Sequence, residues 1–305
     1  MGTRTAGDRL RKRAASSERG RETCIRRLGL CVTVLAATAC LKLPQQHARM
    51  PSAASRELVE GELAGEEGFG QEDERTFLPL AVATDEDYVV RVVAGSVTCS
   101  GSLIAEDRVL TAHHCVSQRA KDGRMLELDV APESVRVELG GDPFAWGEIG
   151  VKAIVAPLCG YSGGEGDIAI VVLERRLAGI ATRRVRLGDP PTAGTPVEPV
   201  GFGRCFLGGS PGGRAIRSGG PIADLWRRSF HVEASICPGD SGGPAVSQTN
   251  GEILGVISEA VMDANPETRE HAEFTRLDAW GPVFTQAQAV VDGMSPAELP
   301  PIDCR

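Results

Sequence analysis

CPGDSGGP, at residues 237–244, has the composition of a tight turn that presents a nucleophile. Ser241 is flanked by glycines, and glycine tolerates the positive φ angles that such turns need. In a turn of this kind the backbone N–H groups of Gly239 and Ser241 can point at one spot, which is the arrangement of an oxyanion hole. The alternative interpretation is an ordinary surface loop, because glycine and proline form loops in many proteins.

Two segments upstream of this turn contain the side chains that a nucleophilic serine requires. Residues 109–115 read VLTAHHC, and residues 166–173 read GDIAIVVL. A serine hydroxyl is a poor nucleophile at neutral pH, so it needs a neighbouring base, which could be His113 or His114. Asp167 precedes an apolar strand, where a carboxylate is costly unless it is hydrogen-bonded. Orienting a catalytic histidine would satisfy this carboxylate; the alternative is a turn aspartate at the start of a strand.

The three segments resemble those of the chymotrypsin/trypsin-like serine proteases, which carry TAAHC, DIAL and GDSGGP in the same order. The resemblance covers roughly residues 86–285. It implies an all-β fold of two antiparallel six-stranded β-barrels of the chymotrypsin-like type with a C-terminal α-helix. The active site of such a fold lies in the cleft between the barrels. The implied function is that of a serine endopeptidase acting on polypeptide substrates.

The resemblance assigns a role to each candidate catalytic residue. Ser241 is the nucleophile, His114 is the general base and acid, and Asp167 orients His114. His114 is favoured over His113 because it directly precedes the cysteine of the motif, whereas His113 stands where the family usually has alanine. Gly239 and Ser241 supply the N–H groups of the oxyanion hole.

The resemblance also places a primary specificity pocket at Ser235, Ser258 and Ala260. Ser235 takes the position at the pocket base where trypsin-like enzymes carry the aspartate that binds arginine or lysine. We therefore expect no strong preference for basic side chains. Residues 258–260 read SEA in place of the family's SWG, and Ala260 would narrow the pocket. A small or medium apolar side chain is the expected preference.

Asp240 lies inside the turn, and the resemblance implies that it pairs with a new N-terminal ammonium after a precursor is cleaved. The family expects a basic residue followed by IVGG, well ahead of the first disulfide cysteine. Arg91 is followed by VVAG but lies too close to Cys99, so we interpret this segment as a strand. Arg75 is better placed, but the wrong residues follow it. Two hypotheses remain: Asp240 has another partner, or the chain is cleaved near residues 78–82.

The nine cysteines indicate an oxidising compartment. Cys24, Cys31 and Cys40 lie in the N-terminal segment, which leaves six for the folded part. The resemblance implies a disulfide between Cys99 and Cys115 that braces the loop carrying the histidine. The other four cysteines permit three connectivities. The family's usual downstream partner of Cys237 is missing before Cys304, so we favour the pairs Cys205–Cys237 and Cys159–Cys304.

The first 40 residues resemble an export signal behind a basic segment. Two arginines precede an apolar run at residues 28–39, which has the length of a signal-peptide core and is short for a membrane span. ATA at residues 37–39 offers a cleavage site, and Cys40 follows at once, as in the lipobox of bacterial lipoproteins. That pattern prefers leucine where Ala37 stands. The segment predicts an exported protein, either a cell-envelope lipoprotein lipidated at Cys40 or a secreted protein with an incidental cysteine.

The remaining chain divides by composition. Residues 41–75 are rich in small residues and then in acids, which indicates a flexible linker or pro-segment. From about residue 76, short β-branched runs alternate with Gly, Asp and Pro, as in antiparallel barrels. The predicted strands are 88–93, 135–139, 149–155, 168–173, 196–201, 229–234 and 253–258. The predicted protease domain spans residues 76–300, with barrel one at about 76–185, barrel two at about 186–276 and an amphipathic helix at about 277–292.

Charge restricts the partners of this chain. The net charge is −8, and the nine basic and three acidic residues of the first 40 contribute +6, so the remainder carries −14. Such an acidic chain has no basic patch to neutralise phosphates, which argues against nucleic acid. The histidines and acids do not form a ligand set, so we predict no metal and no organic cofactor. Membrane contact is expected only through a lipid anchor at Cys40. The sequence carries no information on the oligomeric state.

Two other functions remain open on the same residues. A non-catalytic binding or regulatory protein could use this fold, because fold does not fix function. The missing IVGG segment, His113 and the altered pocket wall leave room for that alternative. The G-x-S-x-G spacing at residues 239–243 would also suit an esterase. Such elbows lead into a helix, however, whereas Pro244 leads into a predicted strand. All three triad residues are present, so we favour the endopeptidase.

Overall fold

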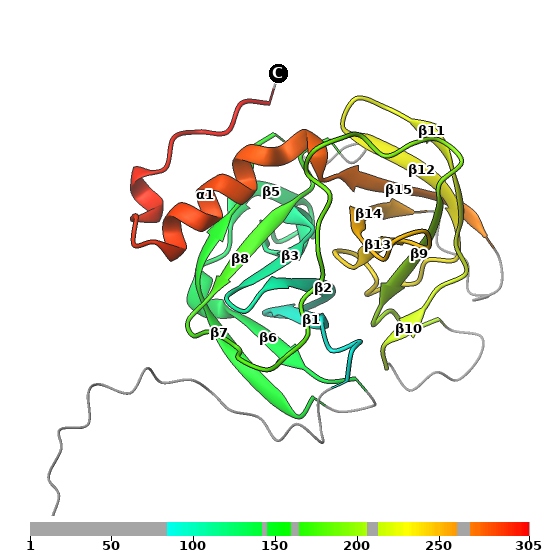
Figure 1. Ribbon diagram of the computed structural model, residues 1–305. Helices are drawn as coiled ribbons and strands as arrows, with labels where there is room; N and C mark the ends of the chain where they lie inside the picture. Colours follow the sequence, from blue (N-terminus) through cyan, green and yellow to red (C-terminus); the bar gives the residue numbers. More distant parts are fainter. Residues whose placement is uncertain (1–83, 142–144, 160–164, 206–212, 261–268, 305) are drawn as a thin grey trace, which may run out of the picture. The chain divides into compact units, whose positions relative to one another are not determined.

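The structure is a computed structural model that describes residues 84–141, 145–159, 165–205, 213–260 and 269–304 (Figure 1). These residues belong to one compact unit of the chain. The predicted export signal, the candidate lipidation residue Cys40, the predicted linker at 41–75 and the hypothetical cleavage region at 78–82 all lie outside the described residues.

The first barrel closes six antiparallel strands around an apolar core. In ring order they are β1 (Val89–Ala94), β2 (Val97–Ala105), β3 (Arg108–Thr111), β8 (Ala169–Leu173), β7 (Gly147–Val155) and β6 (Val135–Leu139). Strand β6 alternates buried and more exposed side chains, as expected for a strand with one face in the core. Every side chain of β8 is buried, because the C-terminal helix packs against this strand.

The second barrel closes in the same way. Its ring consists of β9 (Pro196–Gly201), β11 (Gly220–Leu225), β12 (Ser229–Ala234), β15 (Glu270–Arg276), β14 (Ile253–Ala260) and β13 (Pro244–Ser247), and a pairing of β9 with β13 completes it. The short strand β10 (Ala215–Ile216) pairs with β9 outside the ring. A separate hairpin of β4 (Ser117–Arg119) and β5 (Met125–Asp129) follows the segment that carries the two histidines. In the core of the second barrel, Phe230 and Phe274 stack with their ring centroids 5.2 Å apart.

The helix α1 (Gly281–Val291) is preceded by a 3₁₀ turn at Asp278–Trp280 (Figure 1). It starts later than the predicted helix because the regular part begins at Gly281-Pro282, where proline's missing N–H costs nothing. Its buried face packs on β7 and β8 of the first barrel. Among the described residues, no helix has the length and apolar character needed to cross a membrane.

The fold class predicted from the sequence is therefore confirmed: the chain forms two six-stranded antiparallel barrels and a C-terminal helix. Three predicted strands match the observed bounds, at residues 135–139, 196–201 and 229–234. Strand β2 was missed because its sequence, VTCSGSLIA, is interrupted by serine and glycine. The VVAG segment after Arg91 lies in and just after β1, as interpreted from its distance to Cys99.

Three disulfides brace the unit. They join Cys99 to Cys115, Cys205 to Cys237 and Cys159 to Cys304, so the favoured connectivity is the one observed. The first lies beside the histidines, and the second holds Cys237 at the start of the turn at residues 237–244, here called the nucleophile turn. The third fastens the chain beyond α1 to the segment after β7.

Candidate active site

The candidate catalytic residues come from both barrels. His114 lies on a 3₁₀ turn (His113–Cys115) just after β3, and Asp167 precedes β8. Because β3 and β8 are antiparallel neighbours, with Thr111 opposite Ala169, the end of one strand lies beside the start of the other. Ser241 lies between β12 and β13 of the second barrel.

His114 and Asp167 form a pair with two contacts. The Asp167 carboxylate lies 2.7 Å from His114 Nδ1 and accepts a 2.9 Å hydrogen bond from the His114 backbone N–H. Because the carboxylate requires a donor at Nδ1, the lone pair of the neutral imidazole is placed on Nε2, where a base needs it. This geometry gives His114 both the orientation and the tautomer of a general base.

Asp167 is itself held by the second barrel. Ser258 Oγ of β14 donates a 2.5 Å hydrogen bond to its carboxylate, and Thr275 Oγ1 of β15 donates one of 3.0 Å to its carbonyl oxygen. Burial alone would raise the pKa of Asp167, but the charge of His114 and the hydrogen bonds from His114 and Ser258 together lower this pKa below its usual value. Asp167 is therefore ionised at neutral pH although it is buried.

His113 faces a different partner. Its Nε2 lies 2.7 Å from Asp129 at the end of β5, and the ring is buried. The adjacent histidines therefore each contact their own aspartate, and His114 is the one beside Asp167.

The nucleophile turn docks directly against the first barrel. The Ser241 carbonyl oxygen accepts a 2.8 Å hydrogen bond from the Ser100 N–H of β2. Cys115 Sγ lies 3.7 Å from the same oxygen and 3.6 Å from His114 Nε2. This one disulfide sulfur therefore contacts both His114 and Ser241. Gly242 has φ +82°, and a Cβ there would overlap the Ser100 carbonyl oxygen, so this close approach requires glycine.

Ser241 Oγ and His114 Nε2 are not hydrogen-bonded within the described part of the chain. Catalytic hydrogen bonds are often long without substrate and tighten in the complex.

The turn also orients two backbone N–H groups. The carbonyl oxygen of Pro238 accepts a 2.9 Å hydrogen bond from the Arg204 N–H, and that of Asp240 accepts one of 2.9 Å from the Gly243 N–H. In a trans peptide the N–H points away from the carbonyl, so the N–H groups of Gly239 and Ser241 are directed to the opposite side. Neither donates to a protein group among the described residues, as an oxyanion hole requires.

A family comparison agrees with this arrangement. The trypsin family model matches residues 80–280. The chain belongs to the trypsin family. Membership indicates a serine-type peptidase, a hydrolase.

Three relatives illustrate the extent of the similarity. The chain is 28% identical over 219 residues to the cercarial protease of Schistosoma mansoni, an alignment that covers 61% of this chain and 80% of that protein. It is 30% identical over 213 residues to chymotrypsin-like elastase family member 3B of Macaca mulatta, with 60% and 79% covered. The trypsin of Sarcophaga bullata is 28% identical over 186 residues, with 52% and 67% covered.

The residues predicted for the specificity pocket of this trypsin-family chain lie in the second barrel. Ser235 follows β12 and is buried, and its N–H donates to the Ser218 carbonyl oxygen at 2.8 Å. Ser258 and Ala260 lie on β14, where Ala260 is opposite Ala272 of β15. The Ser258 hydroxyl is engaged by Asp167, a contact that the sequence alone did not reveal.

Two further residues of the site were missed from the sequence. Ser100 contacts Gly239 and Phe202 through its hydroxyl, and Arg217 contacts Asp240. Neither residue belongs to one of the three motifs. The only signal for Arg217 was indirect: Asp240 needed a cationic partner, and no suitable N-terminal sequence was found for one.

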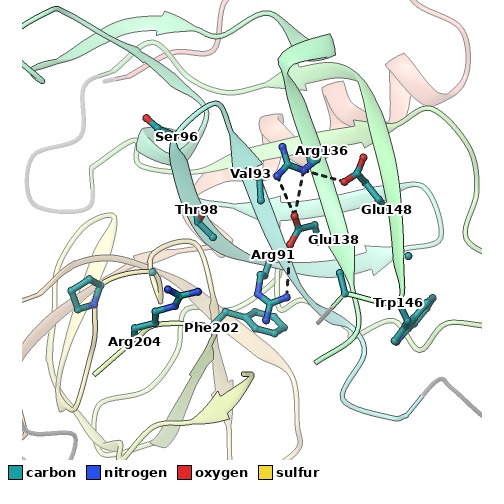
Figure 2. Close-up of a pocket in the computed structure, with 14 residues that line it drawn as sticks. Arg91, Val93, Ser96, Thr98, Arg136, Glu138, Trp146, Glu148, Phe202 and Arg204 are labelled. Atoms are coloured by element: carbon teal, nitrogen blue, oxygen red, sulfur yellow. Dashed lines mark hydrogen bonds and ion pairs between the residues drawn. The ribbon is translucent and has the colours of Figure 1, made fainter. Parts of the chain in front are cut away.

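A cleft of about 1150 Å³ opens beside Gly239 (Figure 2). On one wall Arg136 pairs with Glu138 at 3.3 Å and with Glu148 at 3.1 Å, as Figure 2 shows. Across Phe202 lies Arg204, which forms no ion pair within the described part of the chain. The cleft therefore presents a cation close to Gly239, whose N–H is predicted to form part of an oxyanion hole.

One cluster of metal-ligating atoms occurs among the described residues, formed by Cys99, His114 and Cys115. Both sulfurs belong to one disulfide, so they are not thiolates and the cluster does not fit a metal ion.

Proposed function

We propose that this protein is an exported serine endopeptidase that hydrolyses peptide bonds through an acyl-enzyme on Ser241. The observation that carries the proposal is the contact of His114 Nδ1 with the Asp167 carboxylate at 2.7 Å, beside a turn whose two N–H groups are free to bind an oxyanion. Family membership agrees with this chemistry.

Each step of the reaction has a residue to perform it. His114 accepts the Ser241 proton as Oγ attacks the substrate carbonyl, and the N–H groups of Gly239 and Ser241 stabilise the oxyanion. His114 then gives the proton to the leaving amine, which departs and leaves the acyl group on Ser241. A water molecule repeats the sequence and releases the acid. Asp167 remains ionised throughout and stabilises the imidazolium.

Polypeptides are the proposed substrates. With Ser235 at the base of the primary pocket and Ala260 on its wall, we expect cleavage after small or medium apolar side chains. The cleft of Figure 2 includes Gly239 of the proposed oxyanion hole but none of the predicted pocket residues. It would therefore hold the substrate residues that follow the scissile bond. Arg204 would favour an acidic side chain there. A peptide library dominated by cleavage after Arg or Lys would contradict the pocket assignment.

The proposed location is outside the cytoplasm. Three disulfides fit an oxidising compartment. We propose that residues 1–40 direct export, that 41–75 form a linker or pro-segment and that the protease domain spans 76–300. Whether Cys40 is lipidated or the protein is secreted is decided by metabolic labelling with an alkyne fatty acid. Label that is lost in Cys40→Ser supports the anchor, and an unlabelled secreted wild type supports plain secretion.

Labelling with a fluorophosphonate probe tests the catalytic assignment. The full chain is treated with the probe and the label is mapped by mass spectrometry. We expect Ser241 to be labelled in the wild type, no label in Ser241→Ala, and loss of labelling in His114→Ala. His113→Ala serves as the matched control. A folded wild type that is never labelled, in any processed form, would favour the binding or regulatory function.

A further inference from the structure

The carboxylate of Asp240 lies fully buried beneath the nucleophile turn and accepts four hydrogen bonds. Arg217 Nε donates to Oδ2 at 2.8 Å, and Arg217 Nη2 donates to Oδ1 at 3.0 Å. The backbone N–H of Gly203 donates to Oδ1 at 2.7 Å, and that of Cys237 donates to Oδ2 at 2.8 Å. A carboxylate offers about four lone-pair sites, so all of them are occupied.

Arg217 is fixed from several sides. It follows β10, and its backbone N–H donates to the Pro199 carbonyl oxygen at 2.8 Å. Nη2 also donates to the Gly203 carbonyl oxygen at 2.5 Å, and Nη1 lies 3.5 Å from Cys205 Sγ, one half of the disulfide to Cys237. The guanidinium and the carboxylate are both almost completely shielded from water, at 6% and 0% exposure. A planar guanidinium that forms two parallel hydrogen bonds is a strong and geometrically specific partner for a buried carboxylate.

The space around Asp240 is also filled. A Cβ at Gly201 or at Gly203 would overlap the Asp240 side chain. The donors among the described residues already occupy the lone-pair sites of the carboxylate, so a chain terminus would have to displace one of them to bind there.

This ion pair is linked to the oxyanion hole through the backbone. Asp240 lies between Gly239 and Ser241, the two residues whose N–H groups form the hole. Its Oδ1 fixes Gly203, and the next residue, Arg204, donates the hydrogen bond to Pro238 that sets the direction of the Gly239 N–H. Loss of the cation would leave a buried charge without its partner, and the turn would move to solvate that charge.

We propose that Arg217 is a positioning residue that holds the oxyanion hole in its working conformation in the uncut chain. It takes the place that the sequence resemblance gave to a new N-terminal ammonium. This inference rests on the proposed function. It implies that the catalytic turn is assembled on folding, with no dependence on where the N-terminus lies. A guanidinium keeps its charge at alkaline pH, whereas an α-amino group with its usual pKa of about 8 does not.

The test compares rates of fluorophosphonate labelling on the full-length chain, with the intact N-terminus verified by mass spectrometry. The intact wild type is expected to be labelled at Ser241. Arg217→Gln is expected to lower the labelling rate by about 10²–10³-fold, the effect of losing an oxyanion-hole donor. Arg217→Lys keeps the charge but not the second hydrogen bond, and should recover part of the rate. Arg214→Gln is the matched control, because Arg214 forms a 2.8 Å ion pair with Asp87 and does not contact Asp240.

Two further measurements keep the outcomes distinct. If Arg217→Gln fails to fold, the rate of Arg217→Lys against pH carries the test: it should fall toward pH 10, near the ordinary pKa of lysine of about 10.4, while the wild type stays on its plateau. A wild type that is labelled only after N-terminal cleavage, or an Arg217→Gln rate equal to that of Arg214→Gln, would overturn the inference and leave the proposed function intact. A wild type that is labelled in neither form would overturn the proposed function and the inference with it.

Discussion

The Ser100 hydroxyl donates a 2.8 Å hydrogen bond to the carbonyl oxygen of Gly239. The same hydroxyl accepts a 2.9 Å hydrogen bond from the Phe202 N–H. Ser100 belongs to β2 of the first barrel, whereas Gly239 and Phe202 belong to the second. One buried side chain therefore connects the barrel that carries His114 to the turn that carries Ser241.

Ser100→Ala is expected to weaken both stability and catalysis. It leaves the partly buried Gly239 carbonyl and the buried Phe202 N–H unpaired, which costs about 1–3 kcal/mol of the free energy of unfolding. We expect the fluorophosphonate labelling rate to fall by about tenfold, because the Gly239 peptide loses one of its fixed contacts. Ser102→Ala is the matched control: Ser102 lies on the same strand, and its buried hydroxyl has no partner among the described residues. Equal labelling rates in the two variants would contradict the role given to Ser100.

Asp167→Asn is expected to preserve the fold and to abolish most activity. An amide can donate to Nδ1 and so stabilise the tautomer whose lone pair faces the wrong way, which lowers kcat by about 10⁴ in the triad template. The measurement is kcat on a cleaved peptide, with circular dichroism as the control for folding. A loss of less than about tenfold would show that Asp167 does not orient the base.

The stability of the wild type should fall in acid because of Asp167. The pKa of Asp167 is lowered in the folded state, so between that value and the unfolded value of about 3.9 the unfolded chain binds more protons. The stabilisation is complete above the unfolded value and disappears as the pH falls through the folded one. Urea unfolding at several pH values should show the difference between wild type and Asp167→Asn shrinking below about pH 4. A difference that stays constant down to pH 3 would contradict the lowered pKa.

The sequence predicted those parts of the fold that depend on local pattern. Strands such as 135–139 were found because β-branched residues alternate there, and α1 was found from its helical spacing. Strand β2 was missed because its buried residues include serines and a glycine, which carry no strand pattern. The buried Ser100 forms a hydrogen bond to the other barrel, a role that no local pattern indicates.

The partner of Asp240 shows a second limit. Arg217 lies 23 residues away in sequence and reaches the carboxylate only because β10 pairs with β9 and a disulfide fixes Cys205. No period or motif relates these positions, so only the folded chain brings them together. Motifs could single out His114, Asp167 and Ser241 as candidates because each lies next to its own strand in a fixed order.

Ser235→Asp tests the pocket assignment directly. If Ser235 lies at the base of the primary pocket, a carboxylate there would pair with a basic side chain of the substrate, and kcat/KM for peptides cleaved after Arg or Lys should rise at least about tenfold relative to apolar ones. Ser235→Asn is the control, since it has nearly the same volume without the charge. Similar profiles for the two variants would place the pocket elsewhere.

The disulfides near and far from the turn should separate stability from catalysis. Removing Cys205–Cys237, which spans 32 residues, should cost about 4 kcal/mol by chain entropy, and removing Cys159–Cys304, which spans 145, about 5 kcal/mol. Of these two pairs, the first contacts the Arg217 guanidinium, through Cys205, and the Asp240 carboxylate, through the N–H of Cys237.

We therefore expect the double alanine variant at Cys205 and Cys237 to lose labelling rate as well as stability. The variant at Cys159 and Cys304 should lose stability and keep the wild-type labelling rate at temperatures where it is folded. If the distant pair lowered the labelling rate as much as the near one, the turn would depend on the stability of the whole domain rather than on the contacts beneath Asp240.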